Sequence, residues 1–290
     1  MVIEIKALAC ELPVKSGIPL SRWSTADIAR QVRSAGLVAT ISDKTVWRWL
    51  HEDAIRPWQH RAWLFPRDPE FFAKASRILD LYERTWKGKR LKPDEFVLSA
   101  DEKTSIQARN RRHKTLPTRP GSPMKVEHEY KRCGAWALMA AMDVHRAKFF
   151  SRCERKSGIA PFDRLVDQVM RQPPYNEARR VFWIVDNGSS HRGQKSVLRL
   201  RKKYPKLELV HGPVHASWIN QIEIYFSVLQ RKALTPNDFP SLEALEEHIL
   251  GFQHYYESIA KPFKWKFTKR DLRELFEKID QGKQRLQLAA

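Results

Sequence analysis

Cysteine is scarce in this sequence: three residues, Cys10, Cys133 and Cys153, are spread over 290 positions. None of them forms a C-x-x-C pair, and three isolated thiols supply neither a disulfide framework nor the usual ligands of a structural zinc ion. Disulfide-stabilised secreted folds and cysteine-rich zinc folds are therefore excluded. We expect the three thiols to be buried or inert.

Long apolar runs are also missing. No hydrophobic segment approaches the ~20 residues that cross a bilayer. The N-terminal stretch 1–6 is interrupted by Glu4, unlike a secretion signal. Hydrophobic residues nevertheless make up 42% of the chain, enough to bury a core. We expect a soluble, cytoplasmic protein with no membrane partner, divided into one large and one small domain.

Acidic residues are few relative to basic ones. Thirty-three Asp and Glu stand against 53 Lys and Arg, which gives a net charge of +20. Such an excess favours a polyanionic partner, and nucleic acid is the commonest one. A merely basic, soluble protein is the alternative, which is disfavoured because the cations are mixed with Trp and His in non-repetitive sequence. We therefore expect DNA or RNA, and no small-molecule substrate.

A small helical unit is predicted within residues 23–54. Ser24 and Asp27 have the spacing of a capping box at a helix start. Gly36 can end that helix, and Ser42 can cap the next one. Two short helices joined by a Gly-containing turn are typical of a helix-turn-helix. An ordinary helical hairpin is the alternative.

The second helix of this unit has an apolar face with Val46, Trp49 and Leu50, and a polar face that suits DNA. The DNA-contacting residues expected on the polar face are Lys44, Thr45, Trp47 and Arg48. Arg56 and Arg61 follow in a basic and aromatic stretch. This stretch either lies along a DNA backbone or minor groove, or packs the linker onto a neighbour.

The pattern of the chain changes twice, which predicts its domain organisation. Residues 1–56 hold the helix-turn-helix unit, and residues 57–94 form a linker that includes a helix starting near Asp68. The polar segment 87–94 contains Gly and Pro and marks the boundary. Residues 95–290 form the large domain, in which strand patterns appear.

Two apolar runs in the large domain each end on an acid. Phe96–Ala100 is followed by Asp101, and Val181–Val185 is followed by Asp186 and Asn187. Runs of this kind predict buried strands, and open α/β sheets place their chemistry at the carboxyl ends of strands. The strands expected between residues 96 and 153 form an antiparallel meander, so the fold class is α/β.

A third acid, Glu223, lies near the start of a helix expected from Trp218 to about Ala233, with Ser217 as its cap. Asn220, three residues earlier, would share its helix face. A dense basic stretch also follows Asp101, and it either faces phosphate or is a solvated loop. Its members are Arg109, Arg111, Arg112 and Lys114.

The three acids together predict a metal site. An unpaired carboxylate at the rim of a core is costly, and a bound cation removes that cost. Three carboxylates can hold two divalent ions about 4 Å apart, the arrangement that supports phosphoryl transfer. Oxygen ligands select Mg²⁺ or Mn²⁺ over zinc. His191 either contacts a phosphate or is structural, and Asn187 either orients a ligand or makes the turn that Asn-Gly favours.

Three blocks of this sequence resemble the catalytic blocks of DDE transposases: Ser99–Thr104, Val185–His191 and His215–Glu223. Their patterns, Asp-Glu-Lys-Thr, Asp-Asn-x-x-x-His and Trp-x-Asn-Gln-x-Glu, are jointly specific, whereas any one alone is weak. The sequence resembles insertion-sequence transposases in the bacterial branch of the mariner superfamily. The resemblance covers the chain from about residue 20 to its end.

The resemblance implies a ribonuclease H-like mixed sheet flanked by helices, preceded by a small all-α helix-turn-helix unit. It makes Asp101, Asp186 and Glu223 the catalytic, metal-binding triad. The supporting residues would be Asn187, His191 and Asn220. The family's activity is cut-and-paste transposition, in which Mg-dependent hydrolysis at terminal inverted repeats is followed by strand transfer of the 3′-hydroxyl into target DNA, commonly at TA.

Double-stranded DNA would be the partner, bound by a homodimer in the bacterial nucleoid. Family members usually carry two helical DNA-binding units, and one is found here, which indicates a truncated reading frame or a start at an internal methionine. Two other functions remain open. One is an inactive or truncated remnant that only occupies the repeats. The other is a different ribonuclease H-like nuclease, against which the helix-turn-helix speaks.

Overall fold

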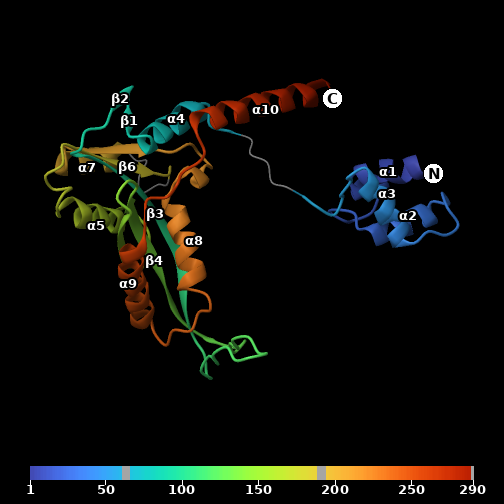
Figure 1. Ribbon diagram of the computed structural model, residues 1–290, viewed down its shortest axis with the longest axis horizontal. Coiled ribbons are helices and arrows are strands. Elements are labelled where there is room, and N and C mark those ends of the chain that lie inside the picture. Colours follow the sequence, from blue (N-terminus) through green and yellow to red (C-terminus); the bar gives the residue numbers. More distant parts are fainter. Residues whose placement is uncertain (61–65, 188–193, 289–290) are drawn as a thin grey trace. The chain divides into compact units, whose positions relative to one another are not determined.

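Two units make up the chain, Met1–Phe65 and Pro66–Ala290. The computed structural model describes residues 1–60, 66–187 and 194–288 (Figure 1). The division falls inside the segment 57–94 that the sequence assigns to a linker, and the helix of that segment belongs to the second unit.

The first unit is all-α. It contains α1 (Val2–Cys10), a 3-10 turn η1 (Pro13–Ser16), α2 (Thr25–Ser34) and α3 (Asp43–Glu52). Ser24 and Asp27 form the predicted capping box, and Ser42 accepts a hydrogen bond from the backbone N–H of Thr45 at the start of α3. The core is made by Ile5, Ala9, Trp23, Ile28, Ala29, Val32, Val46 and Leu50.

Helix α1 has no counterpart in the sequence prediction. Its N-cap, Met1, makes no side-chain cap hydrogen bond, and it lies in an almost continuous apolar run, so neither a cap nor a clear period marks it. Ile5 and Ala9 of α1 are nevertheless buried, because they complete the core that α2 and α3 leave open.

The second unit is built on a five-stranded mixed sheet of order β5-β4-β3-β6-β7. Its strands are β3 (Glu95–Asn110), β4 (Lys131–Asp143), β5 (Lys148–Glu154), β6 (Arg180–Val185) and β7 (Leu207–His211). β3, β4 and β5 pair antiparallel, whereas β6 and β7 join parallel to β3. The predicted antiparallel meander is therefore formed by β3, β4 and β5, three of the five strands. The α/β fold class is confirmed.

Helices cover both faces of this sheet (Figure 1). Phe150 belongs to the core cluster that includes residues of α5 and α7. Its neighbour Phe149 packs against the tilted rings of Tyr225 in α8 and Tyr256 in α9, on the other face, as the alternation along a strand requires. The helices are α4 (Phe71–Tyr82), α5 (Ile159–Met170), α7 (Gln194–Lys203), α8 (Ile222–Lys232), α9 (Leu242–Ile259) and α10 (Lys269–Leu288), and a two-stranded hairpin β1 (Thr85–Trp86) and β2 (Lys89–Arg90) follows α4.

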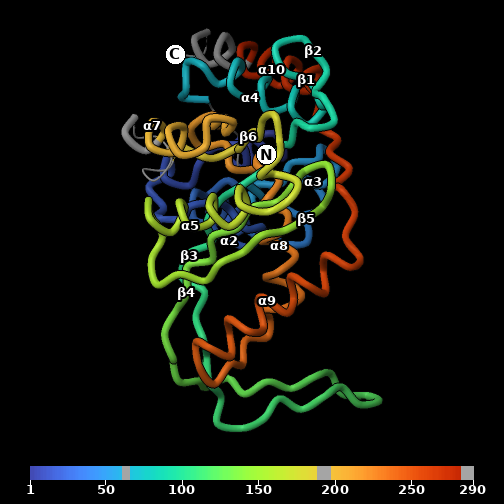
Figure 2. The backbone as a smooth tube through the Cα atoms, turned by 90° about the vertical axis from the view of Figure 1, so that its left-hand side faces the viewer, coloured from blue at the N-terminus to red at the C-terminus, as the bar shows by residue number. Residues whose placement is uncertain are grey.

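Two boundaries differ from the sequence prediction. β3 does not end at Asp101 but continues to Asn110, because residues 102–110 pair with β4 in a hairpin that extends beyond the sheet (Figure 2). The helix that carries Glu223 starts at Ile222, not at Trp218; a 3-10 turn, η2 (Ser217–Ile219), precedes it, and Ser217 makes no cap. No helix in the described part of the chain combines the length and apolar character needed to cross a membrane.

Candidate active site

The parallel pairing of β3 with β6 brings two of the predicted acids level with each other. Ser99 lies opposite Ile184 in the register. Asp101 lies two residues further along β3 and Asp186 is the first residue after β6, so continuing the register places the two acids level. Paired strands are about 4.8 Å apart, and residues two apart on a strand point to the same face. Asp101 and Asp186 therefore project side by side toward the face that Ser99 occupies.

Ser99 also fixes where the third acid lies. Its buried hydroxyl accepts a hydrogen bond of 2.8 Å from the backbone N–H of Ile222 and donates one to Oδ1 of Asn220. Nδ2 of Asn220 donates to the carbonyl of Ala100 at 3.0 Å and to Oδ2 of Asp101 at 3.3 Å. The start of α8 is thus held against β3, and the first turn of α8 carries Glu223.

The electrostatics show that the three acids share one region. Asp101 is only 8% exposed. Burial is the main reason that the pKa of Asp101 rises from 3.8 to about 7. The negative charges of Asp186, Glu102 and Glu223 add to the rise, and a hydrogen bond from the backbone N–H of Glu102 opposes it. Burial also raises the pKa of Glu223; Lys103 opposes this shift and Asp186 adds to it. The structure therefore brings Asp101, Asp186 and Glu223 together.

This cluster suits divalent cations by its chemistry. Three mutually repelling carboxylates, one of them buried, gain most when a cation neutralises them. Among the described residues, no group of three or more His, Cys, Asp or Glu is arranged as a metal cage. Magnesium does not need such a cage, because it keeps several waters and usually binds one or two carboxylates. The donor set fits Mg²⁺ or Mn²⁺ held by pairs of these acids.

The predicted supporting residues have different positions. Asn220 is buried and orients Asp101, but it precedes α8 and does not share a helix face with Glu223, so that expectation is wrong. The amide of Asn187 donates to the carbonyl of Gly212, so it holds a loop beside Asp186. His191 lies outside the described residues.

The candidate DNA-binding residues of α3 form an exposed face. Lys44 and Arg48 are exposed, and Trp47 is 48% exposed with its ring stacked on His51 at 4.6 Å. The hydroxyl of Thr45 instead forms a hydrogen bond of 2.9 Å with that of Ser42, the N-cap residue of α3. Arg56 is exposed, and Arg61 lies outside the described residues.

The four basic residues after Asp101 divide into two pairs. The guanidinium groups of Arg109 and Arg111 lie over the ring of Tyr130, at 4.5 and 5.6 Å. Nε of Arg111 also donates to the carbonyl of Asn237 at 3.1 Å. These contacts lie at the far end of the long hairpin, where β3 ends and β4 begins. Arg112 and Lys114 are exposed beyond it.

Sequence reasoning missed two residues that the geometry adds to the site, Ser99 and Lys103. Each is two positions from Asp101 on β3, and strand periodicity could have found both, since residues two apart share a face. The positive charge of Lys103 opposes the rise in the pKa of Glu223.

Changing Asn220 to aspartate tests the contact that orients Asp101. The variant puts a carboxylate oxygen where Nδ2 now donates to Ala100 and Asp101, so we expect a loss of about 2 kcal/mol or more of stability at pH 8, with partial recovery below pH 5. Chemical denaturation at pH 8 and below pH 5 measures the free energy of unfolding of the variant and the natural chain. The matched control is Asn237→Asp, which removes a comparable donor to the carbonyl of Gln107 away from the acids. Equal losses in the two variants would contradict the role of Asn220.

Comparison with known proteins agrees with this geometry. The sequence model of a family described as "DDE superfamily endonuclease" matches residues 97–246, more than half of the chain and a range that includes all three acids. No curated protein matches the sequence significantly.

Solved structures resemble the chain as well. One is the Mos1 mariner paired end complex with Mn, at 17% identity and a TM-score of 0.53, covering 97% of this chain and 77% of that one. Another is the Mos1 strand transfer complex, at 16% identity and a TM-score of 0.55, covering 97% of this chain and 76% of that one. A pre-cleavage Mos1 transpososome has 16% identity and a TM-score of 0.54, with coverages of 97% and 77%. At such identities the likeness shows only the fold, which is an all-α unit followed in the chain by a ribonuclease H-like mixed sheet.

Proposed function

Because the chain belongs to the DDE superfamily of endonucleases, we propose that it is a transposase that cuts DNA at terminal inverted repeats and transfers the freed 3′-hydroxyl into target DNA. The observation that carries the proposal is the acidic cluster on one face of the sheet, in which the charges of Asp186 and Glu223 both act on the buried Asp101. A DNA-binding protein without chemistry has no use for buried, mutually repelling carboxylates.

Asp101, Asp186 and Glu223 would hold Mg²⁺ or Mn²⁺, two ions per site. When bound, such ions activate a water or hydroxyl nucleophile and stabilise the leaving oxygen of a phosphodiester. The remaining roles belong to the protein. Asn220 fixes one oxygen of Asp101, while the backbone N–H of Glu102 donates to the other at 2.8 Å. Lys103 supplies a positive charge beside Glu223, where a substrate phosphate would be attracted.

The proposed partners are double-stranded DNA at the element ends and at the target, with TA as the preferred target dinucleotide by family resemblance. The exposed face of α3, with Lys44, Trp47 and Arg48, would read the inverted repeats. A homodimer on DNA is proposed because two ends must be joined, and the similar Mos1 structures include paired end complexes. A cytoplasmic, nucleoid-associated location in a bacterium is part of the same proposal.

The test is cleavage of a duplex that carries the inverted repeats flanking the gene. We expect Mg-dependent nicking by the natural chain, and loss of nicking with retained binding in Asp186→Ala, since removing one of three carboxylates leaves α3 untouched. Asp163→Ala is the matched control, because Asp163 pairs with Arg199 on the surface at 2.8 Å, away from the cluster. Repeat binding without nicking by the natural chain would instead identify a catalytically inactive remnant.

A further inference from the structure

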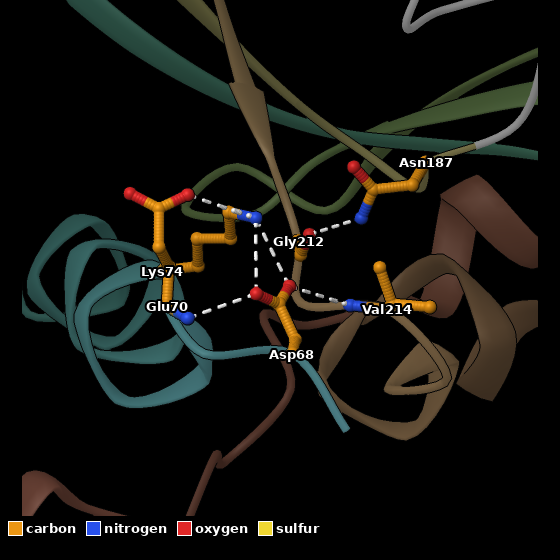
Figure 3. A network of polar contacts seen from close by, with 6 residues as sticks. All are labelled: Asp68, Glu70, Lys74, Asn187, Gly212 and Val214. Carbon is orange, nitrogen blue, oxygen red and sulfur yellow. Dashed lines mark hydrogen bonds and ion pairs between the residues drawn. The ribbon is translucent and has the colours of Figure 1, made fainter. Parts of the chain in front are cut away.

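A buried carboxylate outside the acidic cluster holds the loop next to it. Asp68 precedes α4 and is 9% exposed. Its oxygens accept hydrogen bonds from the backbone N–H of Val214 at 3.1 Å, from the backbone N–H of Glu70 at 2.9 Å and from Nζ of Lys74 at 3.0 Å (Figure 3). Burial alone would raise the pKa of Asp68, but these three donors outweigh it and the pKa is lowered. Asp68 is therefore an ionised anchor for the segment between β7 and α8.

The anchored segment, residues 212–221, is called the site loop here. At its start, the carbonyl of Gly212 accepts the side-chain amide of Asn187, the residue after Asp186, and Figure 3 shows this amide pointing at the loop. The N–H of Gly212 donates to the carbonyl of Val185 at 2.9 Å. The loop thus contacts both neighbours of Asp186 in the chain.

The other end of α4 holds the other end of the site loop. The hydroxyl of Tyr82 donates to the carbonyl of Ile219 at 2.7 Å and accepts from the backbone N–H of Gln221 at 3.3 Å. These two peptide groups flank Asn220, which orients Asp101, and Glu223 follows in the first turn of α8. The residues at the two ends of α4, Asp68 just before it and Tyr82 at its last position, therefore contact the site loop near both of its ends.

The backbone of the site loop needs such support. His215 has a φ of +59°, in the left-handed region that non-glycine residues avoid. A conformation of this kind persists only where the surroundings over-determine it, and it is frequent at functional sites. A buried ion pair is also a poor means of adding stability alone. The Asp68–Lys74 pair is thus better explained by the geometry that it imposes on Val214.

We infer that Asp68 and Tyr82 are positioning residues, which use α4 as a brace to fix the site loop and thereby the placing of Asp186 and Glu223 relative to Asp101. The inference rests on the proposed function, since it assigns these residues to the metal-binding geometry of that same cluster. Removing either contact loosens one end of the loop and leaves the carboxylates present but misaligned.

The test uses Tyr82→Phe, which deletes one oxygen and keeps the ring, and Asp68→Asn, which keeps the shape. In the full-length protein without DNA, hydrogen exchange of the peptides spanning residues 207–223 should be at least about tenfold faster than in the natural chain, with the rest of the sheet unchanged. The Mg²⁺ concentration that gives half of the metal-induced rise in melting temperature should increase about 10- to 100-fold, the usual effect of losing a residue behind a metal ligand.

The matched controls lie on the far side of the sheet. Tyr204→Phe removes the hydrogen bond of 2.9 Å that the Tyr204 hydroxyl donates to Asp167. Asp167→Asn removes the charge of its acceptor and keeps the shape. Both controls should keep natural loop exchange and a natural Mg²⁺ requirement. Repeat binding by all four variants should equal that of the natural chain, because α3 is unchanged.

Three outcomes would count against the brace. Unchanged exchange of the site loop in both variants overturns it. Faster exchange throughout the sheet with an unchanged Mg²⁺ midpoint overturns it as well, because Asp68 and Tyr82 would then only stabilise the fold. A natural chain with no response to Mg²⁺ overturns the proposed function and with it the positioning role, while the exchange data still decide whether α4 holds the loop.

Discussion

Replacing Asp101 by asparagine is expected to abolish DNA cleavage and, without divalent ions, to make the protein more stable at pH 8. Cleavage should fall by at least about 10³-fold, since several kcal/mol of transition-state stabilisation depend on the bound cations. Stability rises because the natural side chain is a buried carboxylate whose pKa, raised chiefly by burial and then by neighbouring acids, is about 7. Asparagine carries no charge and keeps the acceptor for the N–H of Glu102. It gives up the 3.3 Å contact with Nδ2 of Asn220, which reduces the gain.

The direction of the pH effect follows from linkage. The pKa of Asp101 is higher in the folded protein than the ordinary value of 3.8, so the protonated form favours folding. This contribution is complete below pH 3.8 and is lost as the pH rises through about 7. At pH 8 the variant should gain on the order of 2 kcal/mol over the natural chain, or about 4–8 °C in melting temperature. The difference should shrink as the pH falls through this window, and below pH 3.8 the two should differ little.

Thermal unfolding, measured once in the presence of a chelator and once with Mg²⁺, gives the stability of both proteins. Mg²⁺ should raise the melting temperature of the natural chain, because a ligand that binds only the folded state stabilises it, and should act far less on Asp101→Asn. Asp143→Asn is the control: Asp143 is also buried with a raised pKa, but it is bonded to the Tyr175 hydroxyl at 2.9 Å and should not affect the Mg²⁺ response. An asparagine variant that cleaves DNA, or that loses stability at pH 8, would refute the assignment of Asp101.

DNA affinity is expected to fall about 10³- to 10⁵-fold between 50 and 200 mM salt, the range for 6–10 neutralised phosphates. The net charge of +20 supplies the cations, but the structure shows that not all of them are available. On α7, Arg199 pairs with Asp163 and Lys203 with Asp167, at 2.8 and 2.6 Å. By contrast, Lys44 and Arg48 on α3 are exposed.

Two double variants therefore separate the groups of cations. Lys44→Gln with Arg48→Gln should reduce the slope of log affinity against log salt by about 2, one unit for each lost phosphate contact. Arg199→Gln with Lys203→Gln, which removes the same charge from α7, should leave the slope unchanged. Binding titrations at four salt concentrations measure both. A flat salt response of the natural chain would mean that its excess charge serves another partner.

Local signals in the sequence predicted local structure well. The capping box of Ser24 and Asp27 and the cap of Ser42 involve residues three apart, and both are present as expected. The strand that ends before Asp186 was also predictable, because β6 is buried along nearly its whole length and has an unbroken apolar run. These features depend on neighbours in the chain and need no tertiary information.

The errors arose where distant segments decide the outcome. β3 extends past Asp101 because β4 pairs with it as far as Asn110, which no pattern within residues 101–110 reveals. α8 begins late because the hydroxyl of Ser99 accepts the N–H of Ile222, 123 positions away. The contacts of Asp68 and Tyr82 with the site loop carry no local signal, since the partners there lie 146 and 137 positions further on.

These long separations also set the time at which the enzyme can first act. Val214 leaves the ribosome 146 residues after Asp68, which corresponds to roughly 7–30 s of synthesis at ~5–20 residues per second. Throughout that interval the all-α unit Met1–Phe65 can already fold, whereas Asp101 and Asp186 still lack their partners further along the chain. A nascent or prematurely terminated chain should therefore hold DNA without cutting it, which would protect the genome until translation has passed Glu223.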